Sequence, residues 1–416
     1  MLQTKDSKIQ WVGDIPAHWE TLPLYCFFGE RKNKNRLGKE QNLLSLSYGK
    51  IIRKDINTNG GLLPASFNTY NIIEANDIII RPTDLQNDKR SLRTGYVNEH
   101  GIITSAYIAL KPIAEVNSKF IHYLLHAYDV MKVFYNMGNG VRQGLNFDEF
   151  KRLIVLVPPM KEQKNIADFL DEKCNEIDAL IEDIQAQIDT LEEYKRSTIS
   201  QAVLFGLGAT PKTKNSGIFY IGEINRNWSI SKIGYTCTKL TRLFKPEDTA
   251  LICSNKGKVL IRDEKAVGKM VSEDNAMQGI QAGDIAIHGM DTWHGAIALS
   301  DYSGKITRVV HVCDSTEDKR FIVYYLQHLA FRDVYKLISN GVRGNTSDFR
   351  SWDKVRDIYI PLPPTKDEES KICDYLDNVC SNVESIIEQK KEQLSTLEDY
   401  KKSIIYEYVT GKKEVV

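Results

Sequence analysis

The sequence predicts an α+β protein in which two globular domains of mixed α/β structure are separated by two long helices packed as an antiparallel coiled coil. Apolar residues recur at steps of three and four through residues 160–205 and 365–410, and neither stretch contains Gly or Pro. The letters also repeat: Thr-Leu-Glu-Glu-Tyr-Lys-Arg-Ser at 190–197 is matched 206 residues later by Thr-Leu-Glu-Asp-Tyr-Lys-Lys-Ser at 396–403. The chain is therefore predicted to be an internal tandem repeat with pseudo-twofold symmetry.

The predicted helices are longer than ordinary globular helices. A helix over residues 161–206 would extend about 69 Å at about 1.5 Å per residue, and it needs a partner along its length. The second stretch has the same length and pattern, which favours an antiparallel coiled coil. The alternative is two independent helices, each lying on its own domain. Tyr194 and Tyr400 fall on the apolar stripe and are predicted to belong to the coiled-coil core.

In chain order, each half begins with the same short element, because residues 11–19 are echoed by residues 220–228. Residues 76–81 and 283–288 are each a β-type apolar run that enters a polar loop. Strand-like runs at 153–157 and 358–362 lead into the Pro-Pro pairs before the long helices. The predicted domains are residues 1–157, a globular domain with its opener; 158–206, the central helix; 207–227, the joint and second opener; 228–362, the second globular domain; and 363–416, the C-terminal helix.

Composition and charge narrow the class of protein. With 42% hydrophobic and 26% charged residues over 416 positions, the chain can bury two or three cores. No signal region or membrane-length apolar run is present, so we expect a cytoplasmic protein. The net charge of zero hides a segregation: residues 20–156 have 18 Lys and Arg against 13 Asp and Glu, whereas residues 160–207 have 5 against 11. Clusters such as residues 31–36 suggest contact with a polyanion, and a solvated charged face is the alternative.

Motifs for catalysis are absent from the sequence. There is no Gly-x-Ser-x-Gly, no phosphate-binding Gly-x-x-x-x-Gly-Lys-Ser/Thr and no Cys-x-x-Cys pair among the seven cysteines. The only local concentration of histidines is His288 and His294, with Trp293 between them. A metal there would need a further ligand, so contact with DNA bases or plain loop packing is preferred. We expect a non-enzymatic chain without a metal or cofactor of its own.

The chain resembles the specificity subunits of type I restriction-modification systems over essentially its whole length. The resemblance rests on Gly-Asp-Ile-Pro-x-x-Trp at 13–19, on Val-Pro-Pro-Met-Lys-Glu-Gln at 157–163 leading into a long helix, and on the second copy of the whole plan. In the second half, Asn225 replaces the opener proline and Glu369 stands where the glutamine would be.

The resemblance implies a subunit of the restriction system that reads DNA and does no chemistry. Its two target-recognition domains would each bind one part of a split asymmetric sequence in double-stranded DNA. Its helices would act as spacers and dock two methyltransferase subunits. Methyl transfer from S-adenosylmethionine, and ATP- and Mg-dependent translocation and cleavage, would belong to the methyltransferase and restriction subunits.

The predicted DNA contacts are polar groups in loops beside the framework strands. Arg and Asn can pair bidentately with guanine and adenine edges, whereas Lys mainly holds phosphate. The candidates are Tyr48, Lys50, Arg53, Arg81, Lys89, Arg90 and Arg93 in the first domain, and Asn255, Lys256, Lys258, Arg262, His288, Trp293 and His294 in the second. Arg142 and Arg343 occur in both halves, so they fit either phosphate positioning or bracing of the turn against the long helix.

Two other functions stay open at this level. A coiled-coil scaffold that binds proteins without DNA specificity would show no salt-sensitive DNA binding. A DNA methyltransferase or nuclease with an unrecognised catalytic motif would act on DNA without partner subunits.

Overall fold

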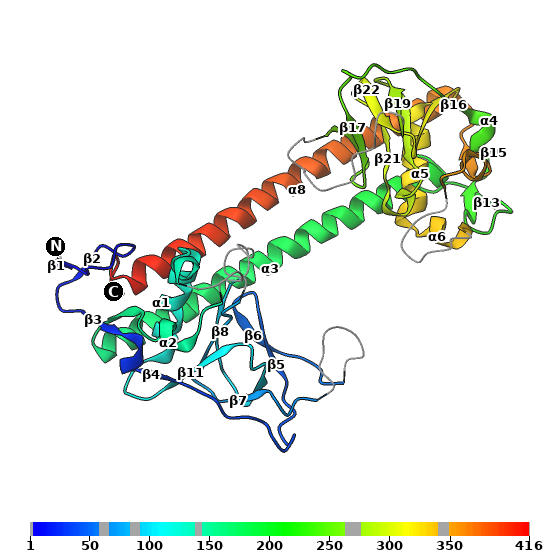
Figure 1. Ribbon diagram of the computed structural model, residues 1–416. Helices are drawn as coiled ribbons and strands as arrows, with labels where there is room; N and C mark the ends of the chain where they lie inside the picture. The colour runs from blue at the N-terminus through cyan, green and yellow to red at the C-terminus, as the bar shows by residue number, and fades with distance from the viewer. Residues whose placement is uncertain are drawn as a thin grey trace. The chain divides into compact units, whose positions relative to one another are not determined.

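The computed structural model describes residues 3–57, 66–83, 92–137, 144–262, 276–339 and 349–415 (Figure 1). The chain forms two compact units: unit 1 comprises residues 1–184 and 392–416, and unit 2 comprises residues 185–391. Each unit contains one β-rich region and a part of each long helix, α3 (Met160–Phe205) and α8 (Lys366–Val409).

Unit 1 is built on a four-stranded antiparallel sheet in the order β4-β11-β8-β9, and its other strands pair as β1–β2, β3–β12, β5–β6 and β7–β10. The described strands are β1 (Thr4–Asp6), β2 (Asp14–Pro16), β3 (Glu20–Pro23), β4 (Phe28–Glu30), β5 (Leu44–Ser47), β6 (Lys50–Arg53), β7 (Asn71–Ile73), β8 (Ile78–Ile80), β9 (Thr94–Tyr96), β10 (Gly101–Ile103), β11 (Ile108–Pro112) and β12 (Ile154–Val157). Besides its parts of α3 and α8, unit 1 has the α-helices α1 (Ser118–Val130) and α2 (Phe147–Phe150) and the short 3-10 helices Leu24–Cys26 and Val133–Asn136.

The sheet of unit 1 is covered on both faces, which explains the unbroken apolar run of β8. Successive side chains of a strand point to opposite faces. Ile78 and Ile80 join a core that includes Leu124 of α1 and Leu170 of α3. Ile79 instead joins a smaller core formed with β5, β7 and β10. The β5–β6 hairpin is therefore attached to the sheet face away from α1.

Unit 2 repeats this topology strand for strand. Its sheet has the order β16-β23-β20-β21, and its other strands pair as β13–β14, β15–β24, β17–β18 and β19–β22. The described strands are β13 (Thr213–Asn215), β14 (Glu223–Asn225), β15 (Ser229–Lys232), β16 (Cys237–Leu240), β17 (Leu251–Ser254), β18 (Lys258–Ile261), β19 (Met277–Ile280), β20 (Ile285–His288), β21 (Ile297–Leu299), β22 (Gly304–Thr307), β23 (Val310–Ser315) and β24 (Tyr359–Leu362). The described helices are α4 (Ile233–Thr236), α5 (Lys319–Phe331), α6 (Val334–Ile338) and α7 (Trp352–Arg356).

The repeated opener is explained by a buried tryptophan in each unit. Trp19 and Trp228 are both buried, and a buried indole N–H needs an acceptor. Trp19 Nε1 donates to Glu162 at 2.8 Å, and Trp228 Nε1 donates to Glu368 at 2.9 Å. Both glutamates lie in the first turn of a long helix, where a negative charge is also favoured by the helix dipole. The opener thus attaches to the start of its long helix.

The long helices pack on each other in each unit, as predicted. In unit 1, Lys401 Nζ of α8 donates to Asp178 of α3 at 2.6 Å, and the rings of Phe169 and Tyr408 lie 4.5 Å apart. Residue numbers therefore rise along α3 as they fall along α8. The same order holds in unit 2, where Lys195 contacts Glu384 and Gln187 contacts Lys390. The helix pair is antiparallel.

The prediction that Tyr194 and Tyr400 lie in the helix core is wrong. Their side chains are 51% and 53% exposed. Lys195 and Lys401 take the inward position instead, because their charged ends meet carboxylates across the pair while their stems are largely covered. Adjacent residues on a helix point about 100° apart, so the tyrosines face outward.

Candidate nucleic-acid interface

Each unit presents a β-hairpin whose turn carries predicted contact residues. Between β5 and β6, Tyr48 and Gly49 have φ angles of 47° and 79°, the positive values that a two-residue type I′ turn requires. The side chain of Tyr48 is 85% exposed. Between β17 and β18, Asn255 and Lys256 are exposed and Gly257 takes the positive φ of 69°. The two turns share a position but differ in length and in side chains.

The lysine after each turn is bound to a long helix. Lys50 Nζ lies 2.8 Å from Asp178, and Lys258 Nζ lies 2.7 Å from Glu384. Each carboxylate also accepts a hydrogen bond from the other long helix, from Lys401 in unit 1 and from a lysine at the equivalent position in unit 2. We call each group of two lysines and one carboxylate a clasp. Burial opposes ionisation of Asp178 and Glu384, yet the two lysines outweigh it and lower the pKa of each carboxyl.

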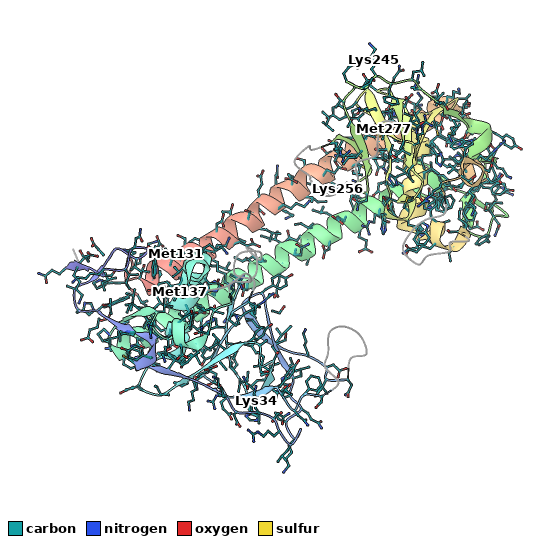
Figure 2. The ribbon with its side chains drawn as sticks, in the orientation of Figure 1. Lys34, Met131, Met137, Lys245, Lys256 and Met277 are labelled. Atoms are coloured by element: carbon teal, nitrogen blue, oxygen red, sulfur yellow. The ribbon has the colours of Figure 1, made fainter. Side chains whose placement is uncertain are left out.

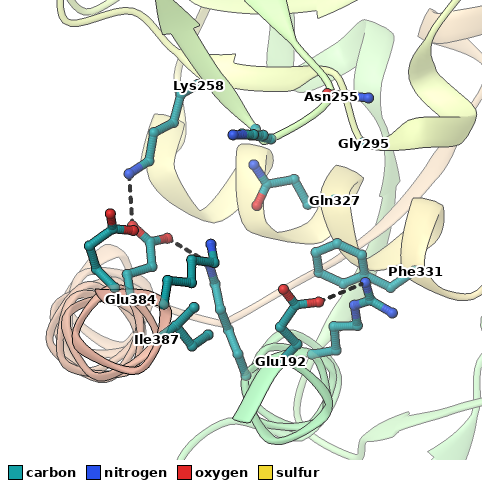
Figure 3. A pocket seen from close by; sticks show the side chains of 14 residues that line it. Glu192, Asn255, Lys258, Gly295, Gln327, Phe331, Glu384 and Ile387 are labelled. Atoms are coloured by element: carbon teal, nitrogen blue, oxygen red, sulfur yellow. Dashed lines mark hydrogen bonds and ion pairs between the residues drawn. The ribbon is translucent and has the colours of Figure 1, made fainter. Parts of the chain in front are cut away.

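The clasp of unit 2 borders an open cavity of about 440 Å³ between the hairpin, α5 and the two long helices. Figure 3 shows Lys258 reaching from the hairpin to Glu384, with Gln327 and Phe331 of α5 on the other side. In unit 1, a cavity of about 420 Å³ lies at the equivalent place and is lined by Tyr48 and both lysines of its clasp. Each clasp therefore closes one side of a gap between hairpin and helices.

Two predicted arginines of unit 1, Arg53 at the end of β6 and Arg81 just after β8, make hydrogen bonds within the protein. Arg53 Nε donates to both carboxylate oxygens of Glu99, at 2.8 and 2.9 Å. Arg81 follows β8, and its backbone N–H donates to the carbonyl of Arg93. In unit 2, Arg262 continues the β17–β18 hairpin through a backbone hydrogen bond to Ala250.

Arg93 is removed from the predicted DNA contacts by its burial. Its side chain is fully buried, and Nη1 donates to the carbonyl of Thr83 at 2.5 Å. Its backbone N–H donates to the buried Asp129 of α1 at 2.6 Å. A side chain without exposed surface has nothing to offer DNA, so Arg93 holds the loop after β8 against α1.

The histidine loop of unit 2 divides into structural and exposed side chains. His288 Nδ1 accepts the backbone N–H of Asp291 at 3.1 Å, and burial lowers the pKa of His288 despite the nearby carboxylate. Trp293 packs against the core of unit 2. His294 is exposed and remains the member of this loop that can reach a ligand. Lys89, Arg90, Arg142 and Arg343 lie outside the described residues.

One feature of the surface was not predicted from the sequence. The loops that follow β4 and β16 each expose a leucine, Leu37 and Leu243, among basic residues. Both loops are anchored by a half-buried arginine that pairs with a buried aspartate, Arg31 with Asp77 in unit 1 and Arg242 with Asp284 in unit 2. In the sequence, the sign of these exposed residues is a single leucine within a run of basic residues, once in each half.

Among the described residues, metal ligands are not clustered and two buried cysteine thiols have raised pKa values. Within these ranges, no group of three or more His, Cys, Asp and Glu could hold a metal ion. Burial raises the pKa of Cys174 to about 11 and that of Cys253 to about 12, so these thiols stay protonated at neutral pH. Along the same part of the chain, no helix combines the length and apolar character needed to cross a membrane.

Comparisons with known proteins agree with this geometry. A family model described as the type I restriction modification DNA specificity domain matches residues 28–190. The chain is similar to the putative type I restriction enzyme MjaX specificity subunit of Methanocaldococcus jannaschii, with 23% identity over 322 residues, 72% of this chain and 69% of that protein. It is equally similar to the MjaVIII specificity subunit of the same organism, with 23% identity over 343 residues, 77% of this chain and 76% of that protein.

Among solved structures, the chain is similar in fold to one chain of a structure described as the structural basis underlying complex assembly and conformational transition of the type I R-M system. The TM-score is 0.60 at 14% sequence identity, over 96% of this chain and 99% of that chain.

Proposed function

Since this chain is a specificity subunit of the type I restriction-modification family, we propose that it reads a bipartite, asymmetric sequence in double-stranded DNA, one part with each unit. The specificity subunit is the non-catalytic member of such a system, in which the methyltransferase and restriction subunits use S-adenosylmethionine and ATP. We propose that Mg²⁺ also acts in those partner subunits and that the complex works in the cytoplasm.

The observation that carries the proposal is one scaffold with two different surfaces. The sheets have the same strand order in both units, and each hairpin is held by the same kind of clasp. The side chains that the hairpins expose differ, with Tyr48 in unit 1 and Asn255 and Lys256 in unit 2. Two domains with the same scaffold but different exposed side chains are suited to bind two different parts of one DNA target.

We propose that residues 1–157 and 228–362 are the target-recognition domains, that residues 158–206 and 363–416 are spacers and that residues 207–227 join the halves. Exposed side chains near the turns, Tyr48, Asn255, Lys256 and His294, are the preferred base contacts. Lys50 and Lys258 hold the hairpins through the clasps and contribute positive charge beside them.

Exchange of one domain tests this assignment. Replacing residues 20–157 with the equivalent domain of a relative should change one part of the methylated sequence and leave the other part unchanged. Methylome sequencing of cells that carry the chimera and a methyltransferase subunit measures both parts at once. A change in both parts would contradict independent recognition. The purified chain alone should neither methylate nor cut DNA, and methylation should appear when the methyltransferase subunit is added.

We propose that two methyltransferase subunits dock on the long helices, and that restriction subunits join this complex. The exposed Tyr194 and Tyr400 occupy equivalent positions of the repeat, which supports one docking site in each half. In unit 2, Tyr194 lines an open cavity with Leu207 and Tyr375, which gives an aromatic partner side chain a place to pack. Tyr194→Ser and Tyr400→Ser should each reduce the number of bound methyltransferase subunits from two to one, as measured by native mass spectrometry. Retention of both subunits by both variants would refute these docking sites.

A further inference from the structure

Leu37 is held outside the protein surface by a rigid turn. Its side chain is 78% exposed, although the neighbouring Asn35 is buried. The side chain of Asn35 donates to the carbonyl of Glu40 at 2.9 Å and accepts from its N–H at 3.2 Å. The N–H of Gly38 donates to the carbonyl of Asn35, and the N–H of Asn35 donates to Tyr70. These bonds fix the backbone on both sides of Leu37, so its exposure is built into the loop.

Leu243 is presented in the same way in unit 2, and its side chain is 98% exposed. On one side, Arg242 donates two hydrogen bonds, at 2.7 and 2.8 Å, to the buried carboxylate of Asp284. The N–H of Gly279 donates to the carbonyl of Arg242, and a Cβ at Gly279 would lie 2.3 Å from the carbonyl oxygen of Leu243. Only glycine permits this approach. On the other side, Lys305 Nζ donates to the next segment of the loop at 2.6 Å.

The two leucines lie in corresponding loops of the two units. Leu37 precedes β5 by seven residues and Leu243 precedes β17 by eight, although Leu37 lies seven residues after β4 and Leu243 only three after β16. Each follows the first strand of its four-stranded sheet, β4 or β16, and each loop is anchored by an arginine bound to an aspartate before the buried central strand. A single exposed apolar residue is normal on any protein surface. Two that are held by hydrogen-bonded loops at corresponding places in the two units point to a shared role.

The charge around the leucines indicates the chemistry of their partner. Residues 31–39 contain five Lys and Arg and no acidic residue, and residues 239–245 contain three and none. Arg36, Lys39 and Lys245 are exposed. Figure 2 labels Lys34 and Lys245 in these two loops. Double-stranded DNA is a polyanion that also offers apolar surface, at thymine methyl groups and at base steps that an inserted side chain can part.

We propose that Leu37 and Leu243 are apolar contacts to DNA bases, one for each part of the target, while the exposed cations of the same loops hold phosphates. This inference rests on the proposed function and adds a contact type that the polar candidates lack. An apolar contact releases no counterions from DNA, whereas a cation bound to phosphate does. The two kinds of residue therefore differ in the salt dependence of binding.

The test uses the full chain assembled with its methyltransferase subunits and a duplex that carries the target found by methylome sequencing. Leu37→Ala should weaken binding about tenfold at every salt concentration, because most of the apolar contact is lost. The slope of log affinity against log salt should stay as in the wild type. Arg36→Ala should reduce this slope by about one. Leu243→Ala and Lys245→Ala form the matching pair for the second part.

Ile113→Ala is the control for loss of an exposed apolar side chain. Ile113 is 57% exposed, and its N–H donates to Phe27, before β4 rather than in the basic loop after it. Its substitution should leave binding unchanged. On a duplex whose first part is scrambled, Leu37→Ala and the wild type should bind equally.

The outcomes separate the inference from the proposed function. Wild-type affinity of both Leu37→Ala and Leu243→Ala, with a reduced slope in Arg36→Ala, would overturn the apolar contacts while specific DNA binding stands. A wild-type complex that binds target and scrambled duplexes equally would overturn both.

Discussion

Substitution of Glu369 by Gln is expected to stabilise unit 2 in a pH-dependent way. In unit 1, the equivalent Gln163 is buried; its amide donates to the carbonyl of Pro158 at 2.8 Å and its oxygen accepts the N–H of Asn117 at 2.9 Å. Glu369 is also buried and accepts the N–H of Asp318 at 3.0 Å. Among the described residues, its second oxygen, Oε1, has no hydrogen-bond partner. A buried polar atom in that state destabilises the fold.

The magnitude follows from the ionisation of Glu369. Burial, aided by the negative charges of Glu317 and Asp318, raises its pKa from 4.5 to about 7. The carboxyl of the unfolded chain loses its proton first as pH rises, so folding stability falls between about pH 4.5 and pH 7. The full loss is about 3 kcal/mol at higher pH. An amide does not ionise and can donate as Gln163 does. Glu369→Gln should therefore gain about 2–3 kcal/mol at pH 8 and little at pH 4.5.

Urea unfolding at pH 4.5 and pH 8 measures this effect, and hydrogen exchange over residues 366–376 assigns it to the start of α8. Gln163→Glu is the matched control, since it should bring the same loss at pH 8 into unit 1. A Glu369→Gln protein that is no more stable than the wild type at pH 8 would refute the reasoning. A gain of equal size at both pH values would show that lost ionisation is not its cause.

Three further variants test the fold. Asp178→Asn removes the carboxylate of one clasp and should lower the free energy of unfolding by about 1 kcal/mol at neutral pH. Because the pKa of Asp178 is lowered in the folded protein, the wild type should lose this extra stability as pH falls through that pKa. Melting curves between pH 3 and pH 7 would detect the loss. Trp228→Phe removes the hydrogen bond to Glu368 and should cost about 1–2 kcal/mol in urea unfolding; no change would mean that the bond contributes nothing. Gly279→Ala forces a Cβ against the carbonyl of Leu243 and should cost about 1–3 kcal/mol, with unchanged melting as the contrary result.

The long helices and their pairing follow from sequence because one period persists over more than forty residues in each copy. Predictions from the sequence were wrong where the burial of a side chain depends on a partner that is distant in the sequence. Tyr194 fits the period, but the inward place beside it goes to Lys195, whose charge is met by Glu384. Arginine is usually a surface residue, yet the side chain of Arg93 is buried and its guanidinium donates a hydrogen bond to the carbonyl of Thr83. Such partners come together only after the chain has folded, so local pattern cannot reveal them.

The sequence could predict in which loops the candidate contact residues lie, and their contacts with DNA stay a prediction. Residues 47–50 loosely parallel residues 255–258 in the sequence, which marks both stretches as corresponding parts of the repeat but does not predict the hairpins that the structure contains. That Lys50 and Lys258 would reach carboxylates of the long helices was not visible, because Asp178 and Lys50 are far apart in sequence. The exposure of Leu37 and Leu243 could not be predicted from the sequence, because an apolar residue ordinarily indicates the core.

The clasps have a consequence for how a new DNA specificity can arise. Two residues separate β5 from Lys50, whereas three separate β17 from Lys258, and both lysines still reach their carboxylates. The turn can thus gain a residue and change its letters while its attachment stays in place. A library that randomises the turns at 48–49 and 255–257 and keeps both lysines would vary the surface that we propose contacts DNA, without redesigning the frame. We therefore expect that changes at only a few turn residues can alter which DNA sequence such a protein binds.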